Sequence, residues 1–191
     1  GTSTTYCSLG SLTQDIDEDV NTPILSSSPM VIGGLTQDSI KPVITGWALD
    51  MDAGTIAIYV SEPSFGDFNG ARLDLYCCGP GSGASNYFFT DAEFTHTSGL
   101  FSMTLTAQMS INTINALKAD TAIATSSGTS WMTFQSSTLT DVNGNPNNAV
   151  SLAAAFTSDT TGPIAVSWTL DMNQGSASTF TITFNEPVKC G

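Results

Sequence analysis

The sequence P-V-I-T-G-W-A-L-D-M-D-A-G at residues 42–54 is the most informative part of the chain, because it returns as P-I-A-V-S-W-T-L-D-M-N-Q-G at residues 163–175. The two copies lie 121 residues apart (163 − 42). Further along, V-S-E-P at residues 60–63 matches F-N-E-P at residues 184–187 with a spacing of 124 (184 − 60), so three residues are inserted between the two motifs. Repetition at a fixed spacing is typical of an array of similar domains.

The similarity extends to the flanks of these copies. Thr36 to Pro42 resembles Thr157 to Pro163, and the segment that begins at Gly1 resembles the one that begins at Gly128. The spacing predicts three parts: the C-terminal part of a preceding repeat at residues 1–37, a complete repeat at 38–160, and the N-terminal part of a following repeat at 161–191. An incomplete repeat does not cover its own apolar face. We therefore expect each flank to need strands from the rest of a longer chain or from a neighbouring molecule.

Within the complete repeat, short runs that alternate in polarity or are rich in β-branched residues are separated by turns rich in Gly, Asn and Pro. These runs predict seven strands, at residues 43–49, 55–61, 71–77, 87–94, 100–106, 130–135 and 149–156. Short strands at this spacing are typical of a β-sandwich. We expect an all-β protein in which Trp47 and Trp168 occupy equivalent core positions.

One segment departs from the strand pattern. Ile111, Ile114 and Leu117 are spaced three residues apart, behind Ser110 as a possible N-cap. This pattern predicts one short helix per repeat, which crosses from one sheet to the other and covers an open end of the sandwich.

The charge composition excludes several classes of function. Only 11% of the residues are charged, against about 25% in ordinary globular domains, and the net charge is −13. Such a surface repels phosphate backbones and anionic lipids, so we expect neither nucleic-acid nor membrane-surface binding. No stretch is apolar over the roughly 20 residues of a membrane span, so we expect no membrane insertion in this segment. The same acidic surface attracts divalent cations, above all calcium.

The four cysteines are Cys7, Cys77, Cys78 and Cys190, and the only histidine is His96, so the spacing predicts no zinc site. An even number of cysteines in a chain poor in lysine fits an oxidising compartment. Cys77 and Cys78 could form a vicinal disulfide, or each could bridge to a different strand or subunit, and buried thiols are a further alternative. Our hypothesis is that the cysteines link successive repeats or neighbouring chains.

Two segments carry oxygen ligands at alternating positions, as calcium loops do. They are Asp15, Asp17 and Asp19 in the first and Asp141, Asn143 and Asn145 in the second. Neither completes an EF-hand, which also needs a glutamate at position twelve. The Asn143-Gly144 pair is equally typical of a turn that requires a positive φ. Calcium is thus a possible ligand, and no other cofactor is expected.

Candidate catalytic groups are few. His96 stands in T-H-T with no nucleophile motif, which favours a histidine on a surface strand. The carboxylate pairs Asp50 with Asp52 and Asp91 with Glu93 could act as acid and base, but spacing by two residues more often reflects one solvated face of a strand or turn. We therefore expect that the chain is not an enzyme.

Three motifs carry a family resemblance. They are D-T-T-G-P at residues 159–163, F-N-E-P-V at 184–188 and D-V-N-G-N at 141–145, and together they resemble those of bacterial-type, SbsA-like immunoglobulin-like repeats. A further run, I-N-A-L-K-A-D-T-A-I-A-T-S at residues 114–126, extends the pattern. The longer pattern is similar to repeats of long extracellular proteins of algae and protists, as in flagellar mastigonemes. The first repeat departs from it, since residues 14–19 replace the D-x-x-G-N turn.

The resemblance implies a tandem array of immunoglobulin-like β-sandwiches at the cell surface. It implies a structural segment of an extracellular filament, flagellar hair or coat, with self-association between copies. The Ser/Thr-rich stretches, considered by their composition, could carry O-linked glycans, with exposed strands as the alternative. Two alternatives remain open at this point. One is an adhesive module that binds carbohydrate or calcium, and the other is a non-catalytic surface domain of a larger enzyme.

Overall fold

The computed structural model describes residues 6–7, 30–31, 36–79, 85–173 and 178–189. The chain divides into two compact units, residues 1–38 and residues 39–191. What is described of the secondary structure in the first unit is an antiparallel pairing of β1 (Tyr6–Cys7) with β2 (Met30–Val31). All other described elements belong to the second unit.

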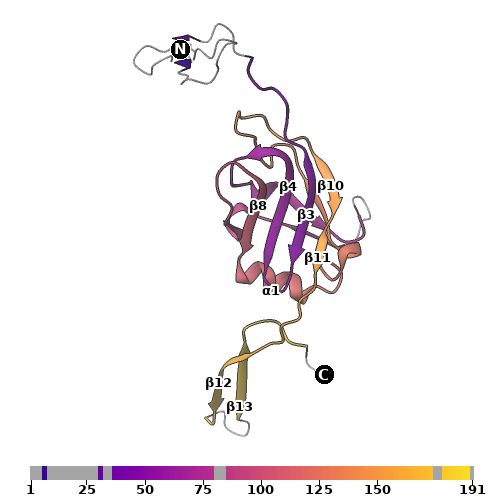
Figure 1. Ribbon diagram of the computed structural model, residues 1–191. Coiled ribbons are helices and arrows are strands. Elements are labelled where there is room, and N and C mark those ends of the chain that lie inside the picture. Colours follow the sequence, from indigo (N-terminus) through magenta and orange to yellow (C-terminus); the bar gives the residue numbers. More distant parts are fainter. Residues whose placement is uncertain (1–5, 8–29, 32–35, 80–84, 174–177, 190–191) are drawn as a thin grey trace, which may run out of the picture. The chain divides into compact units, whose positions relative to one another are not determined.

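Two β-sheets make up most of the second unit (Figure 1). The first sheet has the order β11-β3-β4-β8-β7, with β11 (Ala155–Thr157), β3 (Ile44–Asp50), β4 (Thr55–Ser64), β8 (Ser102–Met109) and β7 (Phe94–His96). The second has the order β10-β9-β5-β6, with β10 (Val150–Ala153), β9 (Trp131–Phe134), β5 (Leu73–Tyr76) and β6 (Asn86–Phe88). Neighbouring strands are antiparallel, except that β11 runs parallel to β3. Short 3-10 helices occur at Gly70–Arg72, Asp91–Glu93 and Ser127–Thr129.

The core lies between the two sheets, because alternate residues of each strand point inward. Trp47 on β3 packs edge-on against Phe134 on β9, with ring centroids 6.2 Å apart. Its indole Nε1 donates a hydrogen bond to the Leu152 carbonyl at 2.9 Å, so the buried polar atom is satisfied. The prediction of an all-β, sandwich-type protein is therefore confirmed at this level for the described residues.

The predicted helix is present as α1 (Ile111–Ala119), the one α-helix in the described part of the chain. The Ser110 hydroxyl accepts a hydrogen bond from the Thr113 amide at 3.2 Å, which is the expected N-cap. Ile114 and Leu117 are buried in the core, whereas Ile111 is exposed. The helix connects β8 of the first sheet to β9 of the second and lies at one end of the sandwich (Figure 1).

Two predicted strands are divided in the structure. The run at 87–94 becomes β6 and β7, because a 3-10 turn capped by Thr90 and Glu93 interrupts it. The run at 149–156 becomes β10 and β11, which pair in different sheets on either side of the buried Ala154. The strand pattern alone does not reveal this change of sheet, since both pieces have strand-like sequences.

The remaining element is a hairpin of β12 (Ala165–Asp171) and β13 (Thr179–Phe184), which forms a separate two-stranded sheet. Within the described residues, no helix has both the length and the apolar character needed to cross a membrane.

Candidate functional site

The β12–β13 hairpin has the same strand register as β3–β4. Trp47 pairs with Ile58 in the first hairpin, and Trp168 pairs with Ile182 in the second. Both first strands also carry a register shift just before the tryptophan, at the same distance from it. The sequence repeat is therefore matched by a repeated backbone geometry.

The hydrogen bonds that close the two hairpins also correspond. In the first, the Val43 amide donates to the Ser61 hydroxyl at 3.0 Å and the Ser61 amide donates to the Val43 carbonyl at 2.9 Å. In the second, the Ile164 amide donates to Asn185 Oδ1 at 2.7 Å and the Asn185 amide donates to the Ile164 carbonyl at 3.1 Å. Residues related by the repeat spacings of 121 and 124 thus make corresponding hydrogen bonds.

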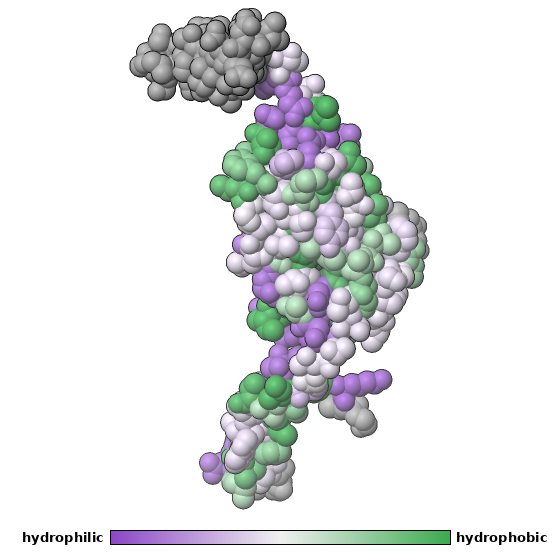
Figure 2. Space-filling view, in the orientation of Figure 1, coloured by the Kyte–Doolittle hydropathy of each residue, from purple (hydrophilic) through white to green (hydrophobic). Residues whose placement is uncertain are grey.

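The two hairpins differ in burial. Trp47 is 1% exposed and Trp168 is 68% exposed. Because side chains alternate between the faces of a strand, the apolar residues of the second hairpin share one face, which we call the apolar hairpin face: Trp168, Leu170, Phe180 and Ile182, all exposed. Figure 2 shows hydrophobic residues on the hairpin. Trp168 therefore does not lie in a core here, although its register is that of a core residue.

A second group of contacts joins the β3–β4 turn to the segment before β12. Asp52 Oδ1 accepts hydrogen bonds from the Thr160 amide at 3.1 Å, the Thr161 amide at 3.0 Å and the Thr161 hydroxyl at 2.8 Å. These bonds, led by the one from the Thr161 side chain, lower the pKa of Asp52 from 3.8 to about 2. The ionised carboxylate of Asp52 thus holds the segment before β12, here called the connecting segment.

Lys118, near the C-terminal end of α1, lies between two carboxylates. Its Nζ is 2.8 Å from Asp159 Oδ2 and 2.6 Å from Glu186 Oε2. The side chains of Lys118 and Glu186 are only 15% and 8% exposed. Burial alone would lower the pKa of Lys118, but the hydrogen bonds to Asp159 and Glu186 outweigh burial and raise the pKa. Nearby, Asn115 Nδ2 donates to the Asn185 carbonyl at 3.3 Å.

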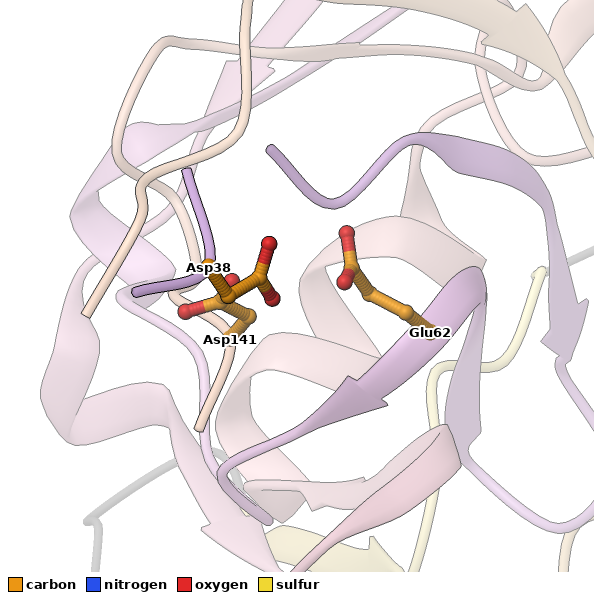
Figure 3. Close-up of side chains that lie close together, drawn as sticks. All are labelled: Asp38, Glu62 and Asp141. Carbon is orange, nitrogen blue, oxygen red and sulfur yellow. The ribbon is translucent and has the colours of Figure 1, made fainter. Parts of the chain in front are cut away.

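Two carboxylates approach one another elsewhere in the second unit. One oxygen of Glu62 lies within 4.8 Å of one oxygen of Asp141, and Figure 3 shows both side chains. Glu62 comes from β4 and Asp141 from the turn after β9.

Asp141 is buried and organises the predicted D-x-x-G-N turn. Its Oδ1 accepts from the amides of Asn143 at 2.8 Å and Asn145 at 2.7 Å, and its Oδ2 accepts from Asn145 Nδ2 at 2.8 Å. Burial alone would raise the pKa of Asp141, but these hydrogen bonds outweigh burial and lower the pKa. Gly144 has φ +88°, the backbone conformation anticipated for this turn. Asn143 and Asn145 therefore act here as hydrogen-bond donors to Asp141.

The other metal and cysteine candidates are described only in part. Asp15, Asp17, Asp19 and Cys190 lie outside the described residues, and of Cys7 only the backbone pairing in β1 is described. Cys77 Sγ lies 2.9 Å from Cys78 Sγ, a hydrogen-bonding distance that exceeds the length of about 2.05 Å of a disulfide bond.

The predicted catalytic candidates have structural partners. His96 Nε2 accepts a hydrogen bond from the Phe68 amide at 3.2 Å, and the two rings pack edge-on. A polar pocket of about 340 Å³ beside them also includes Asp67 and Asp91. Asp50 Oδ1 accepts from the amides of Asp52 and Ala53 within the β3–β4 turn.

Glu93 and its neighbours form a network that the sequence reasoning missed. Its carboxylate accepts hydrogen bonds from the Tyr87 and Thr113 hydroxyls and from the Thr90 amide. Burial alone would raise the pKa of Glu93, but these bonds outweigh burial and lower the pKa. The spacing T-x-x-E at residues 90–93 is a capping-box signal that could have indicated the local part of the network. For the ion pair of Lys118 with Glu186, the only signal in the sequence was indirect, namely that Glu186 belongs to the repeated E-P motif.

No protein family model, curated protein or solved structure matches the chain.

Proposed function

We propose that this chain is a structural segment of a tandem array of immunoglobulin-like sandwiches that works outside the cell. The strand orders support the immunoglobulin-like assignment. In that fold, one sheet has the order A-B-E-D and the other contains the strands C, F and G. If β3 is strand A, the order β3-β4-β8-β7 corresponds to A-B-E-D, and β10-β9-β5 corresponds to G-F-C.

The observation that carries the proposal is the apolar hairpin face. The equivalent face of β3–β4 is covered by a second sheet, and the hairpin has the same register and the same kinds of residue. Covering one large apolar side chain contributes about 1.5–3 kcal/mol, so four such side chains on one face strongly favour a partner sheet. A second sandwich that begins at the hairpin satisfies this need.

An extracellular, load-bearing task follows from the composition and the family resemblance. A chain that is poor in charged residues and rich in Ser and Thr relies on neutral polar groups at its surface. Arrays of sandwiches joined by short connections transmit force from one domain to the next without chemistry. We therefore assign the chain to an extracellular filament, flagellar hair or cell-surface coat, assembled from copies of similar repeats, and we propose no catalytic activity.

A grafted chain tests the array. In it, residues 65–160 of the complete repeat are added again after Val188, the position at which the repeat spacing of 124 places their counterpart. The added strands should fold over the hairpin, so the fluorescence of Trp168 should shift to shorter wavelength and acrylamide should quench it less. A matched graft with Trp168→Phe gives the fluorescence of the other tryptophans, Trp47 and Trp131, which is subtracted to leave the signal of Trp168. Equal quenching of Trp168 in the grafted and original chains would contradict the array.

A further inference from the structure

We propose that one end of the sandwich, formed by Asp52, Asn115 and Lys118 and here called the docking end, is the surface on which the following repeat is held. Lys118 recognises the glutamate of that repeat's E-P motif. This contact between successive repeats presupposes the tandem array proposed above. Its partner is another repeat of the same kind.

The contact has the geometry of a specific attachment. Lys118 reaches Asp159 on the connecting segment and Glu186 just after β13, so a single side chain binds both the connecting segment and the hairpin of the following repeat. Lysine is also favourable near the C-terminal end of a helix, where the backbone carbonyls carry partial negative charge. Because Lys118 and Glu186 are largely buried, removal of Lys118 leaves Glu186 as a buried charge without its lysine. Removal of Glu186 leaves Lys118 with Asp159 as its remaining carboxylate partner.

Two further atoms at this contact indicate room for another donor. Glu186 Oε1 and Asn115 Oδ1 are buried and have no hydrogen-bond partner within the described residues. Since buried acceptors are nearly always satisfied, these two oxygens indicate that the completed contact includes groups beyond those described. A following repeat that continues past β13 would bring such groups to the same place.

The complete repeat contains both halves of the contact. Glu186 corresponds to Glu62 at the spacing of 124, and Asp159 corresponds to Asp38 at the spacing of 121. A repeat therefore offers Lys118 at its docking end and the E-P glutamate where it receives its predecessor. Such a contact is head-to-tail, and it joins any number of repeats in one direction. The partner that fits Glu62 is accordingly the docking end of a preceding repeat with a lysine at the position of Lys118.

Hydrogen exchange in the 191-residue chain tests the first half of the proposal. Lys118→Met and Glu186→Gln should accelerate exchange of the Thr160 and Thr161 amides, which donate to Asp52, by about tenfold, the effect expected for loss of one charged hydrogen bond.

The matched controls change the same kinds of charge away from the docking end. Lys41→Met removes another lysine, which binds Asn148, and Glu62→Gln alters the counterpart of Glu186. Both should leave these two amides unchanged. Equal exchange in Lys118→Met and the original chain would overturn the proposal.

A duplicated chain tests the assigned partner. A second copy of residues 39–159 is inserted after Asp159, so that Lys118 of the first copy precedes Glu62 of the second. Glu62→Gln in the second copy alone should accelerate exchange of the amides at the new junction by about tenfold. If it does not, Glu62 is not the partner of the lysine. The grafted chain described above still reports independently on the array, because it depends on the burial of Trp168 and not on this ion pair.

Discussion

At the residue scale, Trp47 and Trp168 show how far a side chain's burial depends on its surroundings. Each tryptophan pairs with an isoleucine across the same antiparallel register. Trp47 also packs against Phe134 of the second sheet and is buried, whereas Trp168 packs against Phe180 of its own hairpin and is exposed. The same residue therefore contributes very differently to the stability of this chain.

Truncation of the two tryptophans should change the free energy of unfolding by very different amounts. Trp47→Ala should reduce the free energy of unfolding of the sandwich by about 3–5 kcal/mol, because it leaves a large cavity between the sheets. Trp168→Ala, the matched control, should change it by less than about 0.5 kcal/mol, as expected for an exposed position. Urea denaturation followed by circular dichroism measures both. Similar losses for the two variants would mean that the hairpin is part of the sandwich core.

At the element scale, the β3–β4 turn shows how a polar turn can hold a neighbouring segment. Asp50 closes the turn through the amides of Asp52 and Ala53, and Asp52 in turn accepts from Thr160 and Thr161. Spacing by two residues predicted a solvated pair of carboxylates, and Asp52 is exposed. Each carboxylate also accepts from its own set of backbone donors, since the turn directs the two side chains toward different amides.

The attachment of the connecting segment should depend on pH in a defined direction. Asp52 has its pKa lowered from 3.8 to about 2, so its contribution is complete above pH 3.8 and is lost as the pH falls toward 2. Protection of the Thr160 and Thr161 amides, measured by NMR and corrected for intrinsic exchange, should decline across this interval. Asp52→Asn should reduce this pH dependence by the part that Asp52 contributes. Unchanged protection down to pH 2 in the original chain would exclude this role of Asp52.

At the scale of the whole molecule, one complete two-sheet sandwich is followed by a hairpin that repeats its first two strands. The sandwich buries an apolar core between its sheets, but the hairpin exposes an apolar face that a soluble domain would normally cover. Ion pairing by Lys118 and hydrogen bonding by Asp52 hold the residues just before and just after that hairpin. These features favour a chain that continues from domain to domain.

The location of the protein is open to direct test. Antibodies raised against the 191-residue chain should label filaments, flagellar hairs or a surface coat on intact, unpermeabilised cells of the source organism in immunogold electron microscopy. Antibodies absorbed with the same chain serve as the control and should label nothing. Labelling confined to the cell interior would contradict the extracellular function.

The repeat was visible in the sequence because its two copies share their residues. The strand-rich character and the capped helix were predictable because they depend on local patterns of polarity and on residues near one another in the chain. Ile114, Leu117 and Ser110 illustrate this, since a helical period and an N-cap are local properties. The tertiary structure was needed to show that Ala154 separates two strands in different sheets, that Glu93 accepts hydrogen bonds from the Tyr87 and Thr113 hydroxyls, and that Lys118 meets Asp159 and Glu186. Those contacts join residues far apart in the chain, and their energy depends on burial and distance, which no local pattern specifies.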